Sequence, residues 1–366
     1  MRPMMVESEV CSMRRAALFL LVALVSGCAA APTLAQGPIG SNRGGAPSSF
    51  APLVKRVVPA VVNISVVEAG ADLPAASSDV RGLRDRFRRR DPVLGAGSGF
   101  IIDPSGVIVT NTHVVGRATR IAVTLADGTE LPARLVGSDE LTDIAVIRVT
   151  SPTPLPYVEW GDSRVVEVGD WILAAGNPFG VGISVTAGIV SARGRDIGAG
   201  PFDDFLQIDA PINPGNSGGP TFNMEGQVIA VNTAIVSPTG GSVGIGFAVP
   251  SEMASKIVSD LRDKGRIERG WLGVSVQDLP GNRGPRSNAG VSIANIDRTG
   301  PAARAGLKPG DVVVAVDGTR VDTAQGLIKA VAATPPGNAV KLTVRRGGQN
   351  VDIPVTVGRR PAEQQG

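Results

Sequence analysis

The sequence predicts a mainly β protein, in which a large all-β domain of closed barrels precedes a small α+β domain. Three observations support this fold class. Valine and isoleucine supply much of the large apolar side-chain content, aromatic residues make up only 4% of the chain, and the 366 residues include 47 glycines and 28 prolines. β-Branched residues favour strands, and frequent glycine and proline indicate many short elements joined by turns.

The larger domain is expected over residues 51–262. This stretch carries about a dozen short apolar runs that are punctuated by turn residues and not interleaved with helical patterns, which is typical of closed all-β barrels. Asp127-Gly128 lies between two alternating runs and predicts a β-hairpin. A helix is expected at 250–265, with Ser251 as its N-cap and Gly265 at its end.

The smaller domain is expected over residues 267–358, followed by a tail at 359–366. It contains five strand-like runs, "WLGVSV", "GVSIANI", "DVVVAVDG", "AVKLTVRR" and "VDIPVTV". One helix is predicted from about Thr323 to Ala333. No second copy of this unit follows in the sequence.

Residues 1–30 resemble a signal peptide, and residues 31–50 form a small, polar tether rich in Pro and Gly. Two arginines precede an apolar run at 16–25, which is too short to span a bilayer. The following "VSGC" resembles a bacterial lipoprotein motif, with Cys28 as the lipidated residue; ordinary cleavage further on, after Ala35, is the alternative. Translation that begins at Met13 would place the signal at the N-terminus. These features predict a periplasmic or cell-envelope protein with a lipid anchor at Cys28.

Composition excludes several function classes. The formal charge of +3 is too small to indicate nucleic-acid binding, and the only two cysteines, Cys11 and Cys28, lie near the N-terminus. Because both cysteines lie near the N-terminus, no disulfide is expected within the body of the protein. Because the chain also has only one histidine, no His/Cys metal site is expected, and no cofactor is implied. Six arginines between positions 81 and 90 form either a solvated loop or a patch for an anionic surface.

The segment "DAPINPGNSGGP" places Ser217 between glycines that leave it uncovered. A serine hydroxyl becomes a nucleophile only with a base in hydrogen-bond reach and an acid that orients the base. The base is expected to be His113, because the chain has no other imidazole. Asp139, Glu140 and Asp143 are the candidate acids. Asp143 is preferred because it directly precedes the apolar run "IAVIRV".

The order His113, Asp143, Ser217 is the order of the chymotrypsin-type triad. Glycines at 215, 218 and 219 allow backbone N–H groups to point inward, where they could hold the negative oxygen of a tetrahedral intermediate. Each motif is weak by itself. Their combination, in this order and within an all-β domain, predicts a serine peptidase.

At these residues the sequence resembles the HtrA/Deg family of serine proteases. The stretches that carry the resemblance are "GSGFIID", "VIVTNTHVV", "DELTDIAVIRV", "GDSRVVEVGDWILAAGNPFG", "TAGIVSARGR", "FLQIDAPINPGNSGGP" and "GSVGIGFAVPSEMA". The smaller domain resembles a PDZ domain through "RGWLGVSVQ" and "GPAARAGLKPGDVVVAVDGTRV". The resemblance covers about residues 50–358.

The resemblance implies a chymotrypsin-like double β-barrel with the triad in the cleft between the barrels, and an oxyanion hole made by the N–H groups of Gly215 and Ser217. It also implies homotrimers or larger assemblies, without metals or disulfides. In the PDZ domain, Leu272, Gly273 and Val274 are implied to form the loop that binds the carboxylate of a partner's C-terminus. Ile208 and Thr221 depart from the family pattern, which has threonine and leucine there.

The sequence partly indicates which substrates are preferred. Trypsin-like cleavage needs an acid six residues before the serine, and Pro211 occupies that position. The resemblance implies cleavage after small or medium aliphatic residues. The favoured reading is a cell-envelope protease that degrades misfolded or exposed polypeptide. The alternatives are a regulatory protease that cuts one signalling target when a peptide binds the PDZ domain, and a non-catalytic chaperone or scaffold.

Overall fold

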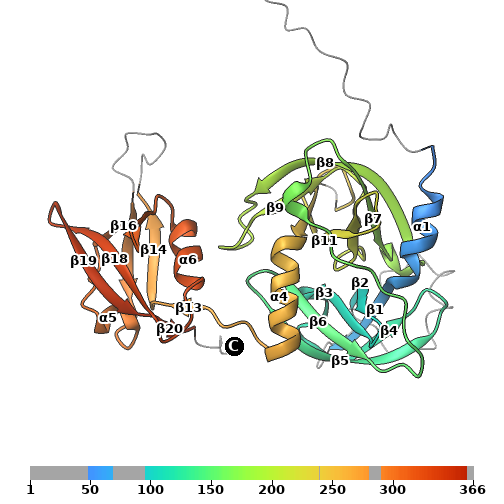
Figure 1. Cartoon of the computed structure of the whole chain (residues 1–366), viewed down its shortest axis with the longest axis horizontal. Coiled ribbons are helices and arrows are strands. Elements are labelled where there is room, and N and C mark those ends of the chain that lie inside the picture. The colour runs from blue at the N-terminus through green and yellow to red at the C-terminus, as the bar shows by residue number, and fades with distance from the viewer. Residues whose placement is uncertain (1–47, 69–94, 239, 280–289, 361–366) are drawn as a thin grey trace, which may run out of the picture. The chain divides into compact units, whose positions relative to one another are not determined.

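The computed structural model describes residues 48–68, 95–238, 240–279 and 290–360 (Figure 1). The expected signal peptide, Cys28, nearly all of the tether and the arginine-rich stretch at 81–90 lie outside these residues. No helix among the described residues is long and apolar enough to span a bilayer.

The first half of the larger domain is a closed barrel of antiparallel strands in the order β1-β2-β3-β6-β5-β4. The Asp127-Gly128 prediction is confirmed, because β4 and β5 form a hairpin in which Gly128 has a φ of 88°. The six strands of this barrel are β1 Val61–Glu68, β2 Gly95–Asp103, β3 Val107–Asn111, β4 Ala118–Thr124, β5 Glu130–Asp139 and β6 Ile144–Val149.

The second half is another closed barrel, in the order β10-β11-β12-β9-β8-β7. Twelve strands in two barrels match the expected all-β domain, and this part of the fold prediction is confirmed. The strands are β7 Trp171–Gly176, β8 Ser184–Arg195, β9 Phe205–Ile208, β10 Pro220–Phe222, β11 Val228–Ile235 and β12 Gly246–Pro250.

One apolar core joins the two barrels. Phe100 and Val109 from the first barrel belong to the same buried cluster as Phe222 and Val231 from the second. Phe100 also meets the ring of Trp160 edge-on, at 5.5 Å between centroids. Burial of apolar surface contributes about 25 cal/mol per Å², so this shared layer fixes the barrels against each other. The strand ends that carry the candidate site residues are therefore held in a defined arrangement.

Helix α4, Ser251–Lys264, packs into this core through Ala254, Val258 and Leu261. Gly265 ends it with a φ of 70°, as predicted. The N-cap prediction is wrong: Pro250 is the N-cap. The Ser251 hydroxyl instead donates to the Gly161 carbonyl at 2.7 Å and accepts from the Ser163 N–H at 3.0 Å. It ties the helix to the preceding loop, which is a tertiary role that local sequence does not reveal.

Short helical elements complete the larger domain. Helix α1 was not expected from the sequence, where residues near 51 were assigned to the strand-rich region. The elements are α1 Ala51–Val57, η1 Val58–Ala60, α3 Thr112–Val115, η2 Ser163–Val165 and η3 Pro178–Gly180.

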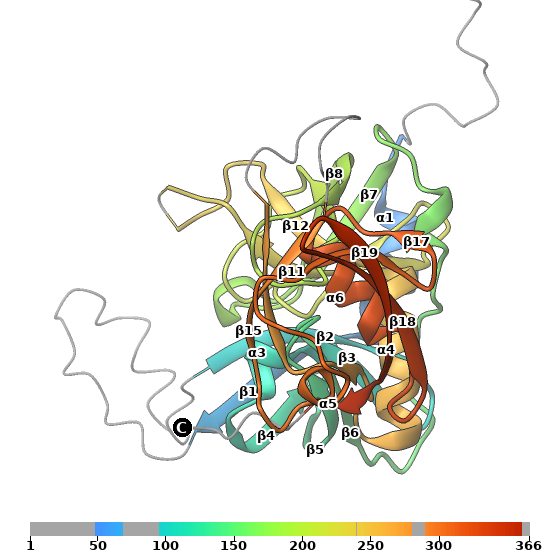
Figure 2. The ribbon, with the colours of Figure 1, turned by 90° about the vertical axis from the view of Figure 1, so that its left-hand side faces the viewer.

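The smaller domain has its own core and a five-strand sheet path in the order β14-β15-β16-β18-β19, with β17 paired to β16 and β13 paired to β20. Four of the five predicted strand runs are present as single strands, whereas "WLGVSV" is divided between β13 and β14, because the chain bends at Gly273. The predicted helix is α6. Figure 2 shows β18 and β19 as long neighbouring strands in orange-red, consistent with their antiparallel register. The elements are β13 Gly270–Trp271, β14 Val274–Asp278, β15 Val291–Ile296, α5 Pro301–Arg304, β16 Val312–Val316, β17 Thr319–Arg320, α6 Ala324–Ala332, β18 Ala339–Arg346, β19 Gln349–Thr356 and β20 Gly358–Arg359.

Candidate active site

His113 and Asp143 form a hydrogen-bonded pair. His113 lies on α3, directly after β3, and Asp143 directly precedes β6, which pairs with β3. His113 Nδ1 is 2.6 Å from Asp143 Oδ2, and the His113 backbone N–H donates to Asp143 Oδ1 at 2.9 Å. Both carboxylate oxygens are therefore engaged by one histidine. This arrangement holds the imidazole so that Nε2 is left to face a substrate or a nucleophile.

The backbone of Asp143 is held in an unusual conformation. Its φ of 57° is in the left-handed region, which non-glycine residues rarely occupy. The carbonyl of Asp143 accepts from the Thr112 N–H at 3.1 Å and from Asn111 Nδ2 at 2.7 Å. Asn111 is fully buried and was not predicted from the sequence. The available signal was an asparagine in an apolar strand, two residues before the chain's single histidine.

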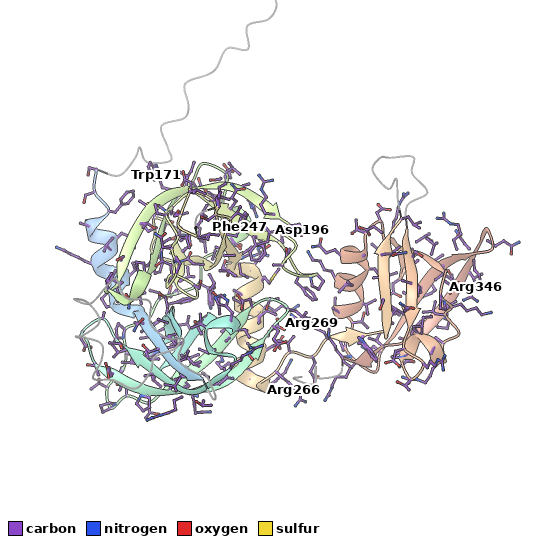
Figure 3. All side chains as sticks on the ribbon, turned by 180° about the vertical axis from the view of Figure 1, so that it is seen from behind. Trp171, Asp196, Phe247, Arg266, Arg269 and Arg346 are labelled. Atoms are coloured by element: carbon purple, nitrogen blue, oxygen red, sulfur yellow. The ribbon has the colours of Figure 1, made fainter. Side chains whose placement is uncertain are left out.

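The structure separates the three candidate acids. Asp139 is the last residue of β5. Its carboxylate accepts from Arg269 at 2.7 Å and from the Thr142 hydroxyl (Arg269 is labelled in Figure 3). Glu140 is exposed, and neither Asp139 nor Glu140 hydrogen-bonds to His113 within the part of the chain that the structure describes. The preference for Asp143 as the partner of His113 is consistent with this geometry.

Ser217 is not hydrogen-bonded to the pair. Its Oγ is 3.5 Å from the Thr233 carbonyl oxygen, and no hydrogen bond between described residues joins it to His113. The Ser217 segment nevertheless packs against the residues that precede His113. A Cβ built on Gly218 would lie 3.0 Å from the Asn111 backbone nitrogen and 2.3 Å from the Ser98 carbonyl oxygen. Only glycine fits at position 218, where φ is 83°.

Two backbone N–H groups within residues 215–219 have no hydrogen-bond acceptor among the described residues. The amides of Asn216, Gly218 and Gly219 donate to Asn213, Asn232 and Asn216 carbonyls at 2.8–3.0 Å. In contrast, the N–H groups of Gly215 and Ser217 have no acceptor among the described residues. Gly215 has a φ of 103°. These are the two amides that the resemblance implied for an oxyanion hole.

The two departures from the family pattern are structurally accounted for. Thr221 is fully buried, and its hydroxyl donates to Asn232 Oδ1 at 2.6 Å. Asn232 in turn accepts the Gly218 N–H through its carbonyl, so Thr221 supports the Ser217 segment indirectly. Ile208 is a fully buried core residue of β9.

A cavity of about 320 Å³ opens beside the His113–Asp143 pair. It is bordered by Thr233 on β11, and its walls mix apolar and acidic side chains. The lining includes Ile197, Phe202, Phe205 and Met253 and the acids Glu140, Asp203 and Asp204. Within the described ranges, no group of three His, Cys, Asp or Glu side chains is arranged to bind a metal ion.

The smaller domain presents a second candidate site at β14, which pairs with β15 and with no other strand among the described residues. The carbonyls of Leu272 and Gly273 accept hydrogen bonds at 2.8 Å from Ala302 and Asp297. Their N–H groups have no acceptor in the described part of the chain. Gly273 has a φ of 76°, which bends the chain just before Val274 begins β14.

Comparison with known proteins defines the class. Residues 97–231 match the model of a trypsin-like peptidase domain, and residues 270–357 match a PDZ domain. The chain is 50% identical over 276 residues to a probable periplasmic serine endoprotease DegP-like from Brucella suis, covering 74% of this chain and 54% of that protein. It therefore spans about half the length of that relative.

More complete matches define the family. A DegP-like protein from Bartonella henselae is 43% identical over 347 residues, covering 86% of this chain and 69% of the relative. A structure of the HtrA-type protease AlgW with a decapeptide aligns with a TM-score of 0.74 at 40% identity, over 86% of this chain and 99% of that chain. A serine endoprotease from Yersinia pestis aligns with a TM-score of 0.69 at 32% identity, over 87% of this chain and all of that chain. The chain belongs to the HtrA/DegP-like family of trypsin-like serine proteases.

Proposed function

We propose that this protein is a serine endopeptidase of the bacterial cell envelope that cleaves misfolded or exposed polypeptides. The observation that carries the proposal is the His113–Asp143 hydrogen bond next to Ser217, in a segment whose Gly215 and Ser217 amides have no acceptor among the described residues. The family membership supports the same chemistry, since its named relatives are serine endoproteases.

In this proposal Ser217 Oγ attacks the scissile carbonyl carbon while His113 Nε2 takes its proton. Asp143 keeps the other ring proton on Nδ1 and stabilises the imidazolium that forms. The carbonyl oxygen becomes an oxyanion, held by the N–H groups of Gly215 and Ser217. His113 then gives its proton to the leaving amine. In the second half of the reaction, water attacks the acyl-enzyme, His113 takes a proton from this water, and the proton returns to Ser217 Oγ as the acid product leaves.

The nucleophile needs a small movement before this chemistry starts. Ser217 Oγ is oriented toward the Thr233 carbonyl and is not bonded to His113. Catalytic hydrogen bonds are often long or misaligned without substrate and tighten when it binds. A rotation about the Ser217 Cα–Cβ bond would redirect Oγ, because glycines flank the residue and leave it room.

The proposed specificity is for small or medium aliphatic residues before the scissile bond. Pro211 stands where a trypsin-like pocket needs an acid. Ile212 is 3% exposed, and a Cβ on Gly246 would lie 3.0 Å from its side chain. Neither Pro211 nor Ile212 offers a carboxylate that could pair with a basic substrate side chain. The cavity beside His113 would take a second, neighbouring side chain of the substrate.

The PDZ domain is proposed to bind C-terminal peptides. An unpaired edge strand can accept an added peptide strand through main-chain hydrogen bonds, and unpaired backbone N–H groups can hold its terminal carboxylate. The β14 edge and the Leu272 and Gly273 amides offer these two features, with Val274 as the first strand residue. The AlgW structures in the comparison are described with a tripeptide and a decapeptide, which supports a peptide-binding role for the matched region.

Location and assembly are part of the proposal. The named relatives are periplasmic, and "VSGC" supports lipidation at Cys28. A trimer or larger assembly is supported by the family resemblance, and several large apolar side chains of the protease domain are exposed. Trp171, whose ring lies 5.8 Å from that of Phe50, is 39% exposed, and Val165 and Val168 are 70% and 61% exposed (Trp171 is labelled in Figure 3). A molar mass of one subunit by light scattering would contradict this assembly.

A second candidate function is a regulatory protease that cuts one target when a peptide occupies the PDZ domain. The favouring observation is that the AlgW structures, which align with this chain at 39% and 40% identity, were solved with a tripeptide and a decapeptide. Incubation of the purified protein with unfolded casein separates the alternatives. Degradation by the wild type, with at least a 10⁴-fold loss in Ser217→Ala, supports quality control. Single cuts that require a C-terminal peptide support regulation, and protection of casein without cleavage supports a scaffold.

A further inference from the structure

Ser98 connects the first barrel to the segment that carries Ser217. It lies on β2 and is fully buried. Its hydroxyl donates to the Gly215 carbonyl at 2.6 Å and accepts from the Asn177 N–H at 2.8 Å. Its backbone N–H donates to the Ser217 carbonyl at 2.8 Å. One residue thus holds the carbonyls at both ends of the Gly215–Ser217 stretch.

These contacts fix two peptide planes. The Gly215–Asn216 plane is held by Ser98 at its carbonyl and by the Asn213 carbonyl at its N–H, 3.0 Å away. The Ser217–Gly218 plane is held by the Ser98 N–H at its carbonyl and by Asn232 at its N–H. The Ser217 N–H belongs to the plane between these two. The hydrogen bonds on the two flanking peptide planes therefore set the direction of the Ser217 N–H.

The Gly215 N–H depends on the same anchor. Glycine rotates about its backbone bonds more freely than any other residue, so the sequence itself does little to hold Gly215 at a φ of 103°. The hydrogen bond from Ser98 to the Gly215 carbonyl opposes rotation of that carbonyl. Without it, the partly buried Gly215 carbonyl and the buried Asn177 N–H would both lose their partner among the described residues, and a rotated peptide would relieve part of that penalty.

We propose that Ser98 is a positioning residue for the oxyanion hole: its hydroxyl holds the Gly215–Asn216 peptide so that the Gly215 and Ser217 N–H groups point at the developing oxyanion. Ser98 touches neither the substrate nor the reacting atoms. The role rests on the proposed peptidase function. Because it acts on the transition state, it affects turnover far more than substrate binding.

The test compares Ser98→Ala with Ser163→Ala in the full-length protein. Ser163 is an equally buried serine whose hydroxyl accepts from the Glu252 N–H and has no bond to residues 213–219 among the described contacts. Turnover of a peptide p-nitroanilide with valine before the scissile bond gives kcat and KM. Inhibition by the matching peptide aldehyde, which forms a tetrahedral adduct with an oxyanion, reports on the hole itself. Melting temperatures report on folding.

For Ser98→Ala the expected kcat is about 10- to 100-fold lower, less than the 10²–10³-fold loss of a whole oxyanion donor. KM should stay within about threefold, and the aldehyde inhibition constant should rise in parallel with the loss of kcat. Ser163→Ala should leave both nearly unchanged. A folded Ser98→Ala protein with wild-type kcat, or with lower kcat but an unchanged aldehyde constant, would overturn the role of Ser98.

If Ser98→Ala does not fold, Ser98→Cys provides the same two measurements. A thiol is close in size to a hydroxyl but donates weakly, so a smaller loss of kcat with a parallel rise in the aldehyde constant is expected, and no change would overturn the proposal. An inactive wild type would instead contradict the proposed peptidase function, and the two failures are thereby distinguished.

Discussion

Replacing Asp143 with asparagine is expected to remove most peptidase activity through the His113 ring proton. In the native pair, Asp143 Oδ1 accepts the His113 backbone N–H and Oδ2 faces Nδ1. Asparagine has only one oxygen, which the backbone N–H would keep. Its NH₂ group would then face Nδ1 as a donor, so Nδ1 would lose its proton and Nε2 would carry it. A protonated, neutral Nε2 cannot accept the proton of Ser217.

The size of the effect follows from these contacts. Flipping the amide to recover the productive tautomer puts its oxygen opposite Nδ1–H but turns its NH₂ group toward the His113 backbone N–H. These two donors then lack acceptors, and each unsatisfied donor costs about 1–3 kcal/mol. Loss of the carboxylate charge also removes the stabilisation of the imidazolium. Together these terms reach about 5 kcal/mol, or a decrease in kcat of about 10⁴-fold.

The assay is steady-state cleavage of the valine p-nitroanilide, with Asp127→Asn as the matched control. Asp127 is an exposed acid in the β4–β5 hairpin, it does not line the cavity beside His113, and it is expected to tolerate the same change within about twofold. Melting curves should show that both variants are folded. If folded Asp143→Asn kept more than about a tenth of wild-type kcat, Asp143 would not be the residue that orients His113.

Three further outcomes are expected. In the PDZ domain the buried Asp311 carboxylate accepts from Arg346 at 2.7 Å (Arg346 is labelled in Figure 3), and this hydrogen bond lowers the pKa of Asp311 although burial opposes it. Its stabilising effect is present above the unfolded value of 3.8 and is lost as the pH falls through the lower folded pKa. Asp311→Asn should therefore lower the melting temperature of this domain at pH 7, by roughly 4–8 °C per kcal/mol lost. The difference in melting temperature between wild type and variant should shrink below pH 3.8. A difference that stays constant across pH would contradict this reasoning. Removing residues 267–366 should alter casein kinetics while a small activated ester is still turned over, and a folded truncation with no turnover of the ester would contradict an independent protease domain. Mass spectrometry of the native N-terminus should find a lipid on Cys28, whereas a mature protein that begins at Gln36 would contradict lipidation.

The parts of the fold that are encoded locally could be predicted from the sequence. The strand runs, the hairpin at Asp127-Gly128 and the end of α4 at Gly265 follow from alternation and from the backbone needs of glycine. The His113–Asp143 contact was also predictable, because the chain has one histidine and the strand after Asp143 fixes that residue. The catalytic roles of these residues stay predictions.

The remaining features depend on contacts between distant segments. Ser251 looks like an N-cap in the sequence, but its hydroxyl bonds to Gly161, which is 90 positions away. Asp139 and Arg269 are 130 positions apart, so the partner of that carboxylate could not be inferred from its neighbours. Asn111 and Ser98 look like ordinary strand residues until the second barrel is placed against the first. Hydrogen bonds of this kind have no local pattern.

The apolar core that joins the barrels has a consequence for how the protein unfolds. Neither barrel can open without exposing Phe100 or Phe222 to water, since both belong to the same buried cluster. Each barrel acts as part of the other's solvent shield, and the pair should unfold as one cooperative unit. Deuterium exchange should therefore reach the innermost amides of β3 and β11 at similar rates. In the proposed protease, this coupling disfavours half-open states, in which one unfolded barrel could be cleaved by an intact neighbouring molecule.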